Sequence, residues 1–177
     1  MRKLTLLIIL VATAAVALPQ QMQMPMPMPK TSGPQSDAQK AFEKLKTLAG
    51  SWEGTFMGRS MKMTIRVTST GNAILHEGSA SGRPDDPITM IYVDGDRLLL
   101  THFCDSGNRP RMQGKLSPDG NTVTFAFLDV SGNTDEFLMR DIVFTMVDAD
   151  HHIEAFTYSL NGKPPFRAPG IQLQRTK

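Results

Sequence analysis

Cysteine is nearly absent from the sequence: its 177 residues include only Cys104. A single thiol forms no disulfide within the chain, although an oxidising compartment would permit one. The fold must therefore be stabilised by a hydrophobic core, and a domain of roughly 140 residues is long enough to build one. We expect the Cys104 side chain to be buried and unreactive, because free cysteine packs as a small apolar residue.

An excess of charge of one sign is also missing. The chain has 19 Lys and Arg against 17 Asp and Glu, a formal net charge of +2. Removing residues 1–17, which contain Arg2 and Lys3, would reduce this charge from +2 to 0. Nucleic-acid binding requires a basic face, so we expect no nucleic-acid partner and no polybasic contact with a membrane.

Established catalytic motifs are absent as well. The sequence contains no P-loop, no G-x-S-x-G, no H-E-x-x-H and no dinucleotide fingerprint. Their absence does not exclude an enzyme, but it leaves any particular reaction without a chemical basis in the sequence. Whether the protein is an enzyme stays undecided at this point.

Residues 1–17 have the features of a secretory signal peptide. Arg2 and Lys3 precede the apolar run LTLLIILVATAAVA, and Ala15-Val16-Ala17 forms a small-residue cleavage site. The run is short for a membrane span, which needs about 20 residues. We therefore predict an exported protein, periplasmic or secreted, with no stable membrane span after the signal is removed.

Residues 18–35 are rich in methionine, proline and glutamine, and they predict an extended, disordered linker. Thioether side chains are soft ligands that favour Cu(I), so the linker could handle copper. We favour the alternative that residues 18–35 are only a low-complexity tether. The methionines in question are Met22, Met24, Met26 and Met28.

Residues 36–177 predict one helix followed by a run of short strands. Ser36 or Asp37 can cap the helix, and Gly50 suits its end. Its apolar residues share one face: Ala38, Ala41, Phe42, Leu45 and Leu48. The strands are predicted at 51–57, 60–69, 73–81, 87–93, 97–104, 110–117, 121–129, 137–148, 151–159 and 170–176.

Tight turns such as DGD and SPDGN separate these ten strands, and no long helix interrupts them. A meander of this length removes its two free edges most easily by closing into a barrel. The predicted fold is therefore all-β: an antiparallel up-and-down barrel of about ten strands, with the N-terminal helix packed at the barrel end.

The segment LLLTHFCDSGNRPRM concentrates polar and reactive side chains around one predicted hairpin. His102 and Cys104 share a strand face, about 6.5–7 Å apart along the strand. A histidine can activate a thiol at hydrogen-bonding distance, but no third group that would orient the pair is evident. We favour the alternative that Leu98, Leu100, His102 and Cys104 form one stripe lining the barrel.

The same segment contains Asn108, Arg109 and Arg111. Two guanidinium groups near a barrel mouth could bind a carboxylate or phosphate. Alternatively, Arg111 lies on a solvated outer face, because exposed arginines are common on strands. The sequence does not decide between these two, and we retain all five of His102, Cys104, Asn108, Arg109 and Arg111 as ligand-binding candidates.

Two further histidines, His151 and His152, lie beside Asp148 and Asp150 at a predicted hairpin tip. Adjacent residues on a strand point to opposite faces. A weak metal site is possible there, but we expect a solvated turn.

The Gly50-Ser51-Trp52 motif after the helix resembles the calycin group, which comprises lipocalins, fatty-acid-binding proteins and nitrobindin-like barrels. The resemblance implies that Arg175 packs on Trp52 and closes one barrel end through a cation–π contact. Nitrobindin-like proteins bind haem through a histidine near the last strand, but this chain has no histidine after Ser159. We therefore expect no haem.

A more specific resemblance is to exported bacterial domains of unknown function that carry a THxCxxGNxPRM segment. The matching residues are Thr101, His102, Cys104, Gly107, Asn108, Pro110, Arg111 and Met112. This resemblance implies a fold but no activity.

Barrels of this size can enclose one small ligand. The sequence thus predicts an exported barrel that binds a small apolar or amphipathic molecule in its lumen. One alternative is a haem- or thiol-dependent redox enzyme that uses His102 and Cys104. Another is a structural or metal-handling protein that uses the methionine-rich segment.

Overall fold

The computed structural model describes residues 34–82, 87–134 and 137–176. The predicted signal peptide, nearly all of the predicted linker and its four methionines lie outside these residues. The description that follows concerns the unit from Pro34 onward. No helix in the described part of the chain is long and apolar enough to span a bilayer.

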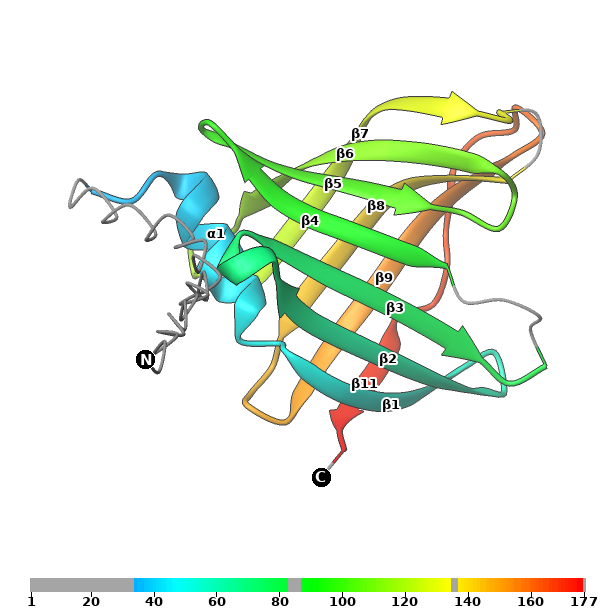
Figure 1. Ribbon diagram of the computed structural model, residues 1–177. Coiled ribbons are helices and arrows are strands. Elements are labelled where there is room, and N and C mark those ends of the chain that lie inside the picture. Colours follow the sequence, from blue (N-terminus) through cyan, green and yellow to red (C-terminus); the bar gives the residue numbers. More distant parts are fainter. Residues whose placement is uncertain (1–33, 83–86, 135–136, 177) are drawn as a thin grey trace, which may run out of the picture. The chain divides into compact units, whose positions relative to one another are not determined.

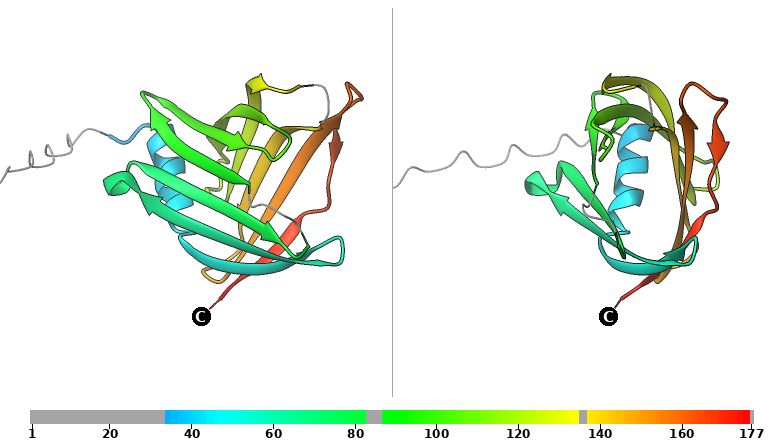
Figure 2. Two further views of the ribbon diagram at one scale, coloured as in Figure 1. Left: turned by 45° about the vertical axis from the view of Figure 1, so that its right-hand side comes forward. Right: turned by 90° about the vertical axis from the view of Figure 1, so that its right-hand side faces the viewer.

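Helix α1 spans Asp37–Lys46 and begins with a complete capping box. The Ser36 hydroxyl accepts a hydrogen bond from the backbone of Gln39, whose side chain in turn accepts one from the Ser36 backbone. The apolar face predicted from the sequence is buried against the barrel interior. In Figure 2, α1 lies across one end of the barrel, and it contacts β4, β5 and β6.

Eleven strands follow α1 in the described residues, and ten of them correspond to the predicted ones; Figure 1 shows their arrangement. Their bounds are β1 Gly50–Phe56, β2 Arg59–Thr68, β3 Ala73–Ala80, β4 Ile88–Asp94, β5 Arg97–Phe103, β6 Asn108–Leu116, β7 Thr122–Gly132, β8 Phe137–Met146, β9 His151–Leu160, β10 Phe166–Arg167 and β11 Ile171–Arg175. The sequence did not predict β10, which has only two residues and pairs with the far end of β9.

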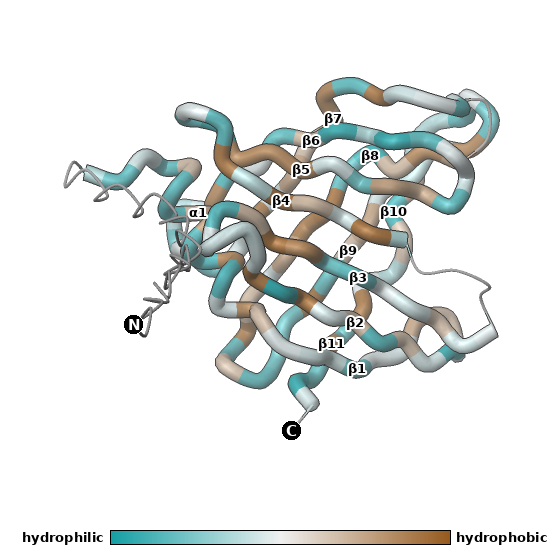
Figure 3. Tube along the Cα trace, viewed as in Figure 1, coloured by the Kyte–Doolittle hydropathy of each residue, from teal (hydrophilic) through white to brown (hydrophobic). Residues whose placement is uncertain are grey.

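The strands close into an antiparallel up-and-down barrel, as predicted. Neighbours in sequence pair from β1 to β9, and β11 pairs with both β9 and β1. Every long strand therefore has a partner on each side, and the sheet has no long free edge. Apolar and polar residues alternate along the strands in Figure 3, which places one face of each strand inside the barrel.

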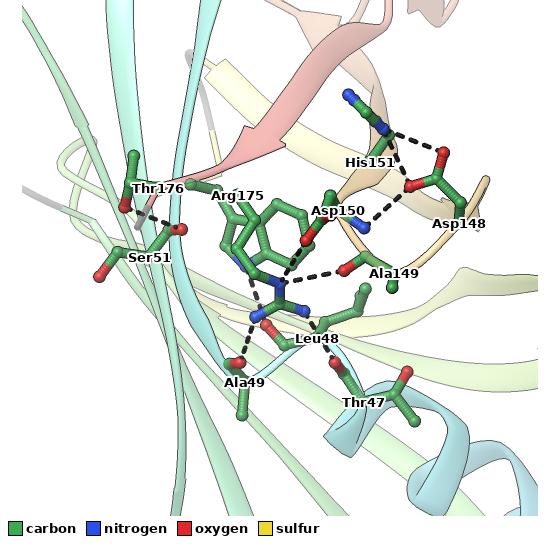
Figure 4. A network of polar contacts seen from close by, with 11 residues as sticks. Thr47, Leu48, Ala49, Ser51, Asp148, Ala149, Asp150, His151, Arg175 and Thr176 are labelled. Atoms are coloured by element: carbon green, nitrogen blue, oxygen red, sulfur yellow. Dashed lines mark hydrogen bonds and ion pairs between the residues drawn. The ribbon is translucent and has the colours of Figure 1, made fainter.

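The end of the barrel beneath α1 is sealed by Arg175 (Figure 4). Its guanidinium group donates hydrogen bonds to the backbone carbonyls of Thr47, Ala49 and Ala149, at 3.1, 2.6 and 3.0 Å. The same group lies 4.1 Å over the ring of Trp52, which is the contact implied by the calycin resemblance. One side chain thus joins the C-terminus of α1, β1 and the β8–β9 turn.

A steric constraint explains why the first residue of the Gly-x-Trp motif is glycine. Gly50 has a φ of 142°, and a Cβ atom at this position would overlap the guanidinium group of Arg175. Next to it, the indole nitrogen of Trp52 donates a hydrogen bond of 2.8 Å to the carbonyl of Leu48. The motif therefore holds the sealed end together.

Candidate functional site

A cavity of about 500 Å³ occupies the barrel at the strand ends away from α1. Its described lining residues are Phe56, Met57, Arg59, Met61, Met63, His76, Gly78, Ala80, Pro87, Thr89, His102, Cys104, Asp105, Phe137, Met139, Phe156, Tyr158 and Ile171. Met57, Arg59 and Asp105 are exposed to solvent, so the cavity reaches the surface. A space of this volume with mostly apolar walls is typical of small-molecule sites.

His102 and Cys104 both line this cavity, from the inner face of β5 and the residue that follows it. The Nδ1 atom of His102 lies 2.8 Å from the hydroxyl of Thr89 on β4. The Cys104 thiol is half-buried, not buried as expected from the sequence, and donates to a carboxylate oxygen of Asp105 at 3.3 Å. The stripe on β5 predicted from the sequence therefore faces the lumen.

The other three candidates in the segment lie elsewhere. Asn108 is buried, and its side-chain amide donates to the carbonyl of Phe137 at 2.7 Å, which ties the β5–β6 turn to β8. Arg109 is exposed, and Arg111 forms a bidentate ion pair with Asp129 of β7.

Alternation on β6 explains this placement, because Asn108, Pro110 and Met112 occupy the inner face. Neither Arg109 nor Arg111 is among the described residues that line the cavity, and the arginine at its mouth is Arg59. The interpretation of Arg111 as an outer-face residue is therefore the one that the structure supports.

A buried acidic and histidine cluster, absent from the sequence-based expectations, lies beside the cavity. Glu154 on β9 is 0 % exposed. Both of its carboxylate oxygens lie 3.1 Å from Nε2 of His76 on β3. One of these oxygens also lies 3.0 Å from Nε2 of His152. Of the three residues, His76 borders the cavity.

The electrostatics of this cluster favour an ion pair. Burial acts to raise the pKa of Glu154, but the charge of His76 and hydrogen bonds from both histidines outweigh burial and lower this pKa to about 2. Burial likewise acts to lower the pKa of His76, but the carboxylate of Glu154 reverses the effect and raises it. The carboxylate is thus ionised and His76 is its cationic partner.

His152 is the third member of the cluster and is 1 % exposed. Its ring meets Trp52 edge-on, with 4.2 Å between the ring centroids. Its Nδ1 atom is buried and has no hydrogen-bond partner. The arrangement therefore fits a ring that carries a proton on Nε2 and donates it to Glu154.

The predicted solvated turn at the β8–β9 tip is correct for His151 and wrong for His152. His151 is exposed, and its Nδ1 lies 2.9 Å from a carboxylate oxygen of Asp148. His152 points the other way, into the barrel. Within the described ranges, no group of three or more histidine, cysteine or acidic side chains is arranged to hold a metal ion.

Comparison with known proteins relates the fold to solved structures only. No family model and no curated protein matches the chain. The crystal structure of Rv2717c from M. tuberculosis matches with a TM-score of 0.58 and 16 % identity, over 77 % of this chain and 98 % of that one. A protein of unknown function from the DUF3598 family of Nostoc punctiforme matches with a TM-score of 0.52 and 12 % identity, over 75 % of this chain. The match spans about half of that protein, 49 %, and at these identities the similarities concern the fold alone.

Proposed function

We propose that this barrel is an exported carrier that binds a small apolar or amphipathic molecule in its cavity. The observation that carries the proposal is the cavity of about 500 Å³, open at the strand ends away from α1. A side-chain-filled barrel would leave no such space, and volumes between about 300 and 1,000 Å³ suit molecules of drug or lipid size.

The chemistry of the walls supports a ligand with a substantial apolar part. Four methionines line the cavity: Met57, Met61, Met63 and Met139. Their unbranched thioether side chains adapt to irregular apolar shapes. Four aromatic rings complete the apolar surface: Phe56, Phe137, Phe156 and Tyr158. Transfer of apolar ligand surface from water to these walls would supply most of the binding free energy.

A fluorescence titration with the uncharged dye Nile red tests this proposal, together with native mass spectrometry for a co-purifying molecule. Ala80 lines the cavity from β3, and Ala80→Trp would fill part of it. The neighbouring Ser79 is on the opposite strand face, so Ser79→Trp is the matched control. We expect the dye to brighten with the wild type and with Ser79→Trp but much less with Ala80→Trp. Equal binding by all three proteins, or by none, would refute luminal binding.

Export is a separate part of the proposal, supported by the sequence of residues 1–17. N-terminal sequencing of protein isolated from its native cells tests it. A mature chain that begins at Leu18 supports export, and an intact Met1 in cytoplasmic protein contradicts it.

A thiol-dependent redox activity is the second candidate, because His102 and Cys104 border the same cavity. The Cys104 side chain is half-buried and lines the cavity. Reaction of the native protein with a maleimide, followed over time, tests for an activated thiolate. A rate no faster than that of a free cysteine peptide would remove this candidate. The histidine implied for haem by the nitrobindin resemblance has no counterpart here, so no redox step through haem is derived.

A further inference from the structure

One side of the inner end of the cavity is polar. Three side chains from adjacent strands lie side by side there: His76 on β3, Thr89 on β4 and His102 on β5. The strand register places Thr89 opposite both histidines. All three are buried, with exposed fractions of 6, 2 and 6 %. On these three strands the next inward-facing residues toward α1 are buried in the core and do not line the cavity: Ile74, Ile91 and Leu100.

The His76–Glu154 pair at this end of the cavity has no net charge. His76 and Glu154 share one proton across a distance of 3.1 Å. Whichever of the two residues holds the proton, the net charge of the pair is zero. The pair therefore offers no spare charge for a ligand ion to neutralise.

Outside this pair, the aspartate, glutamate, lysine and arginine side chains of the described lining lie near solvent. Arg59 and Asp105 are the other charged side chains among the described lining residues, and both are exposed at the mouth. A ligand ion at the inner end would therefore lose its hydration without gaining a counter-ion from these residues. Burial of an ion under such conditions costs several kcal/mol.

The hydroxyl of Thr89 can still make a hydrogen bond to a ligand. A threonine hydroxyl has one donor and two acceptor sites, and one of these serves His102 at 2.8 Å. If the hydroxyl donates to His102, its oxygen can accept from a ligand. If the imidazole is the donor, the hydroxyl hydrogen is available to a ligand oxygen.

We propose that the cavity selects an uncharged amphipathic molecule whose terminal hydroxyl or carbonyl group binds at the His76–Thr89–His102 row. The apolar chain of this ligand lies along the methionine and aromatic walls and extends toward the mouth. This inference rests on the proposed function and adds the charge and the orientation of the ligand. A hydrocarbon without a polar group would leave the second hydrogen-bonding site of the Thr89 hydroxyl unused, and a carboxylate or ammonium group would bury an uncompensated charge.

Displacement of Nile red from the full protein by three ligands of equal chain length tests the head-group selection. The ligands are 1-decanol, decanoate and decyltrimethylammonium, all compared at neutral pH. We expect 1-decanol to displace the dye at a concentration at least about tenfold lower than either ion, which corresponds to about 1.4 kcal/mol. Equal or stronger displacement by decanoate or by decyltrimethylammonium would overturn the inference.

Substitution at the row tests the orientation. Thr89→Val keeps the shape of the side chain and removes its hydroxyl, so we expect the inhibition constant of 1-decanol to rise by about three- to tenfold. Thr101→Val, on the outer face of β5, is the control and should leave this constant unchanged. An unchanged inhibition constant in Thr89→Val would overturn the proposed binding position of the head group. A wild-type protein that fails to bind Nile red would instead refute the proposed function itself.

Discussion

Replacement of Glu154 by glutamine should destabilise the protein markedly and in a pH-dependent way. Glu154→Gln keeps the size of the side chain and removes the negative charge that faces His76 and His152. Removal of one partner from a buried ion pair costs about 3–5 kcal/mol. Because an amide oxygen can still accept one hydrogen bond, we expect a loss near the lower end, about 3 kcal/mol.

The lowered pKa of Glu154 implies a similar contribution of this carboxylate to the free energy of unfolding. The difference between its ordinary value of 4.5 and about 2 in the folded protein corresponds to about 3 kcal/mol. The carboxylate contributes this stability fully above pH 4.5 and loses it as the pH falls toward 2. The raised pKa of His76 contributes stability below 6.5 and loses it as the pH rises through the raised value. The variant should therefore differ most from the wild type between pH 4.5 and 6.5.

Urea unfolding followed by circular dichroism measures this difference at about pH 5.5 and about pH 3. A loss of about 3 kcal/mol would also lower the melting temperature by about 10 °C for a domain of this size. Glu53→Gln, which removes an exposed partner of Lys62, is the control and should change little. A loss below about 1 kcal/mol at the higher pH, or an equal loss at both, would refute the ion-pair assignment.

Two further substitutions test the packing of the barrel. Gly114→Ala would place a Cβ atom 2.6 Å from Cδ2 of Leu98 and 2.7 Å from Cε1 of Phe125, so we expect a loss of about 1–3 kcal/mol in urea unfolding; an unchanged midpoint would contradict this packing. Arg175→Lys keeps the charge but cannot reproduce the three carbonyl contacts or the stacking on Trp52. We expect about 2 kcal/mol of destabilisation and a shift in tryptophan emission, which reports this site alone because the chain has one tryptophan; a variant that leaves both unchanged would show that the seal is not needed.

Strand positions were predictable because local sequence determines them. Short segments of alternating apolar and polar residues, separated by turns rich in glycine and aspartate, indicated ten strands. A capping residue indicated the start of α1. The exception, β10, has no local signal of this kind. Phe166 and Arg167 are extended because they pair with Tyr158 and Thr157 on β9, and such a pairing depends on tertiary structure.

The candidate site was predictable only in part. His102 and Cys104 were identified as a lining stripe, and alternation along β5 was sufficient for this. Alternation on β9 also carried a signal for His152 and Glu154, which occupy one face. This signal was missed because the residues around His152 were expected to form a solvated hairpin tip. No local pattern could have shown that His76 meets Glu154, because the two residues are 78 positions apart.

The pairing of β1 with β11 also determines when the barrel can be completed during folding. Arg175 binds the carbonyl of Ala49 across 126 positions of sequence, so nearly the whole domain must be synthesised before this contact can form. Until Ile171–Arg175 is available, β1 and the first half of β9 each present unpaired backbone groups. Contacts of such long range make folding slow. A chain interrupted before β11 would therefore be an open sheet with two edges free to pair with other chains.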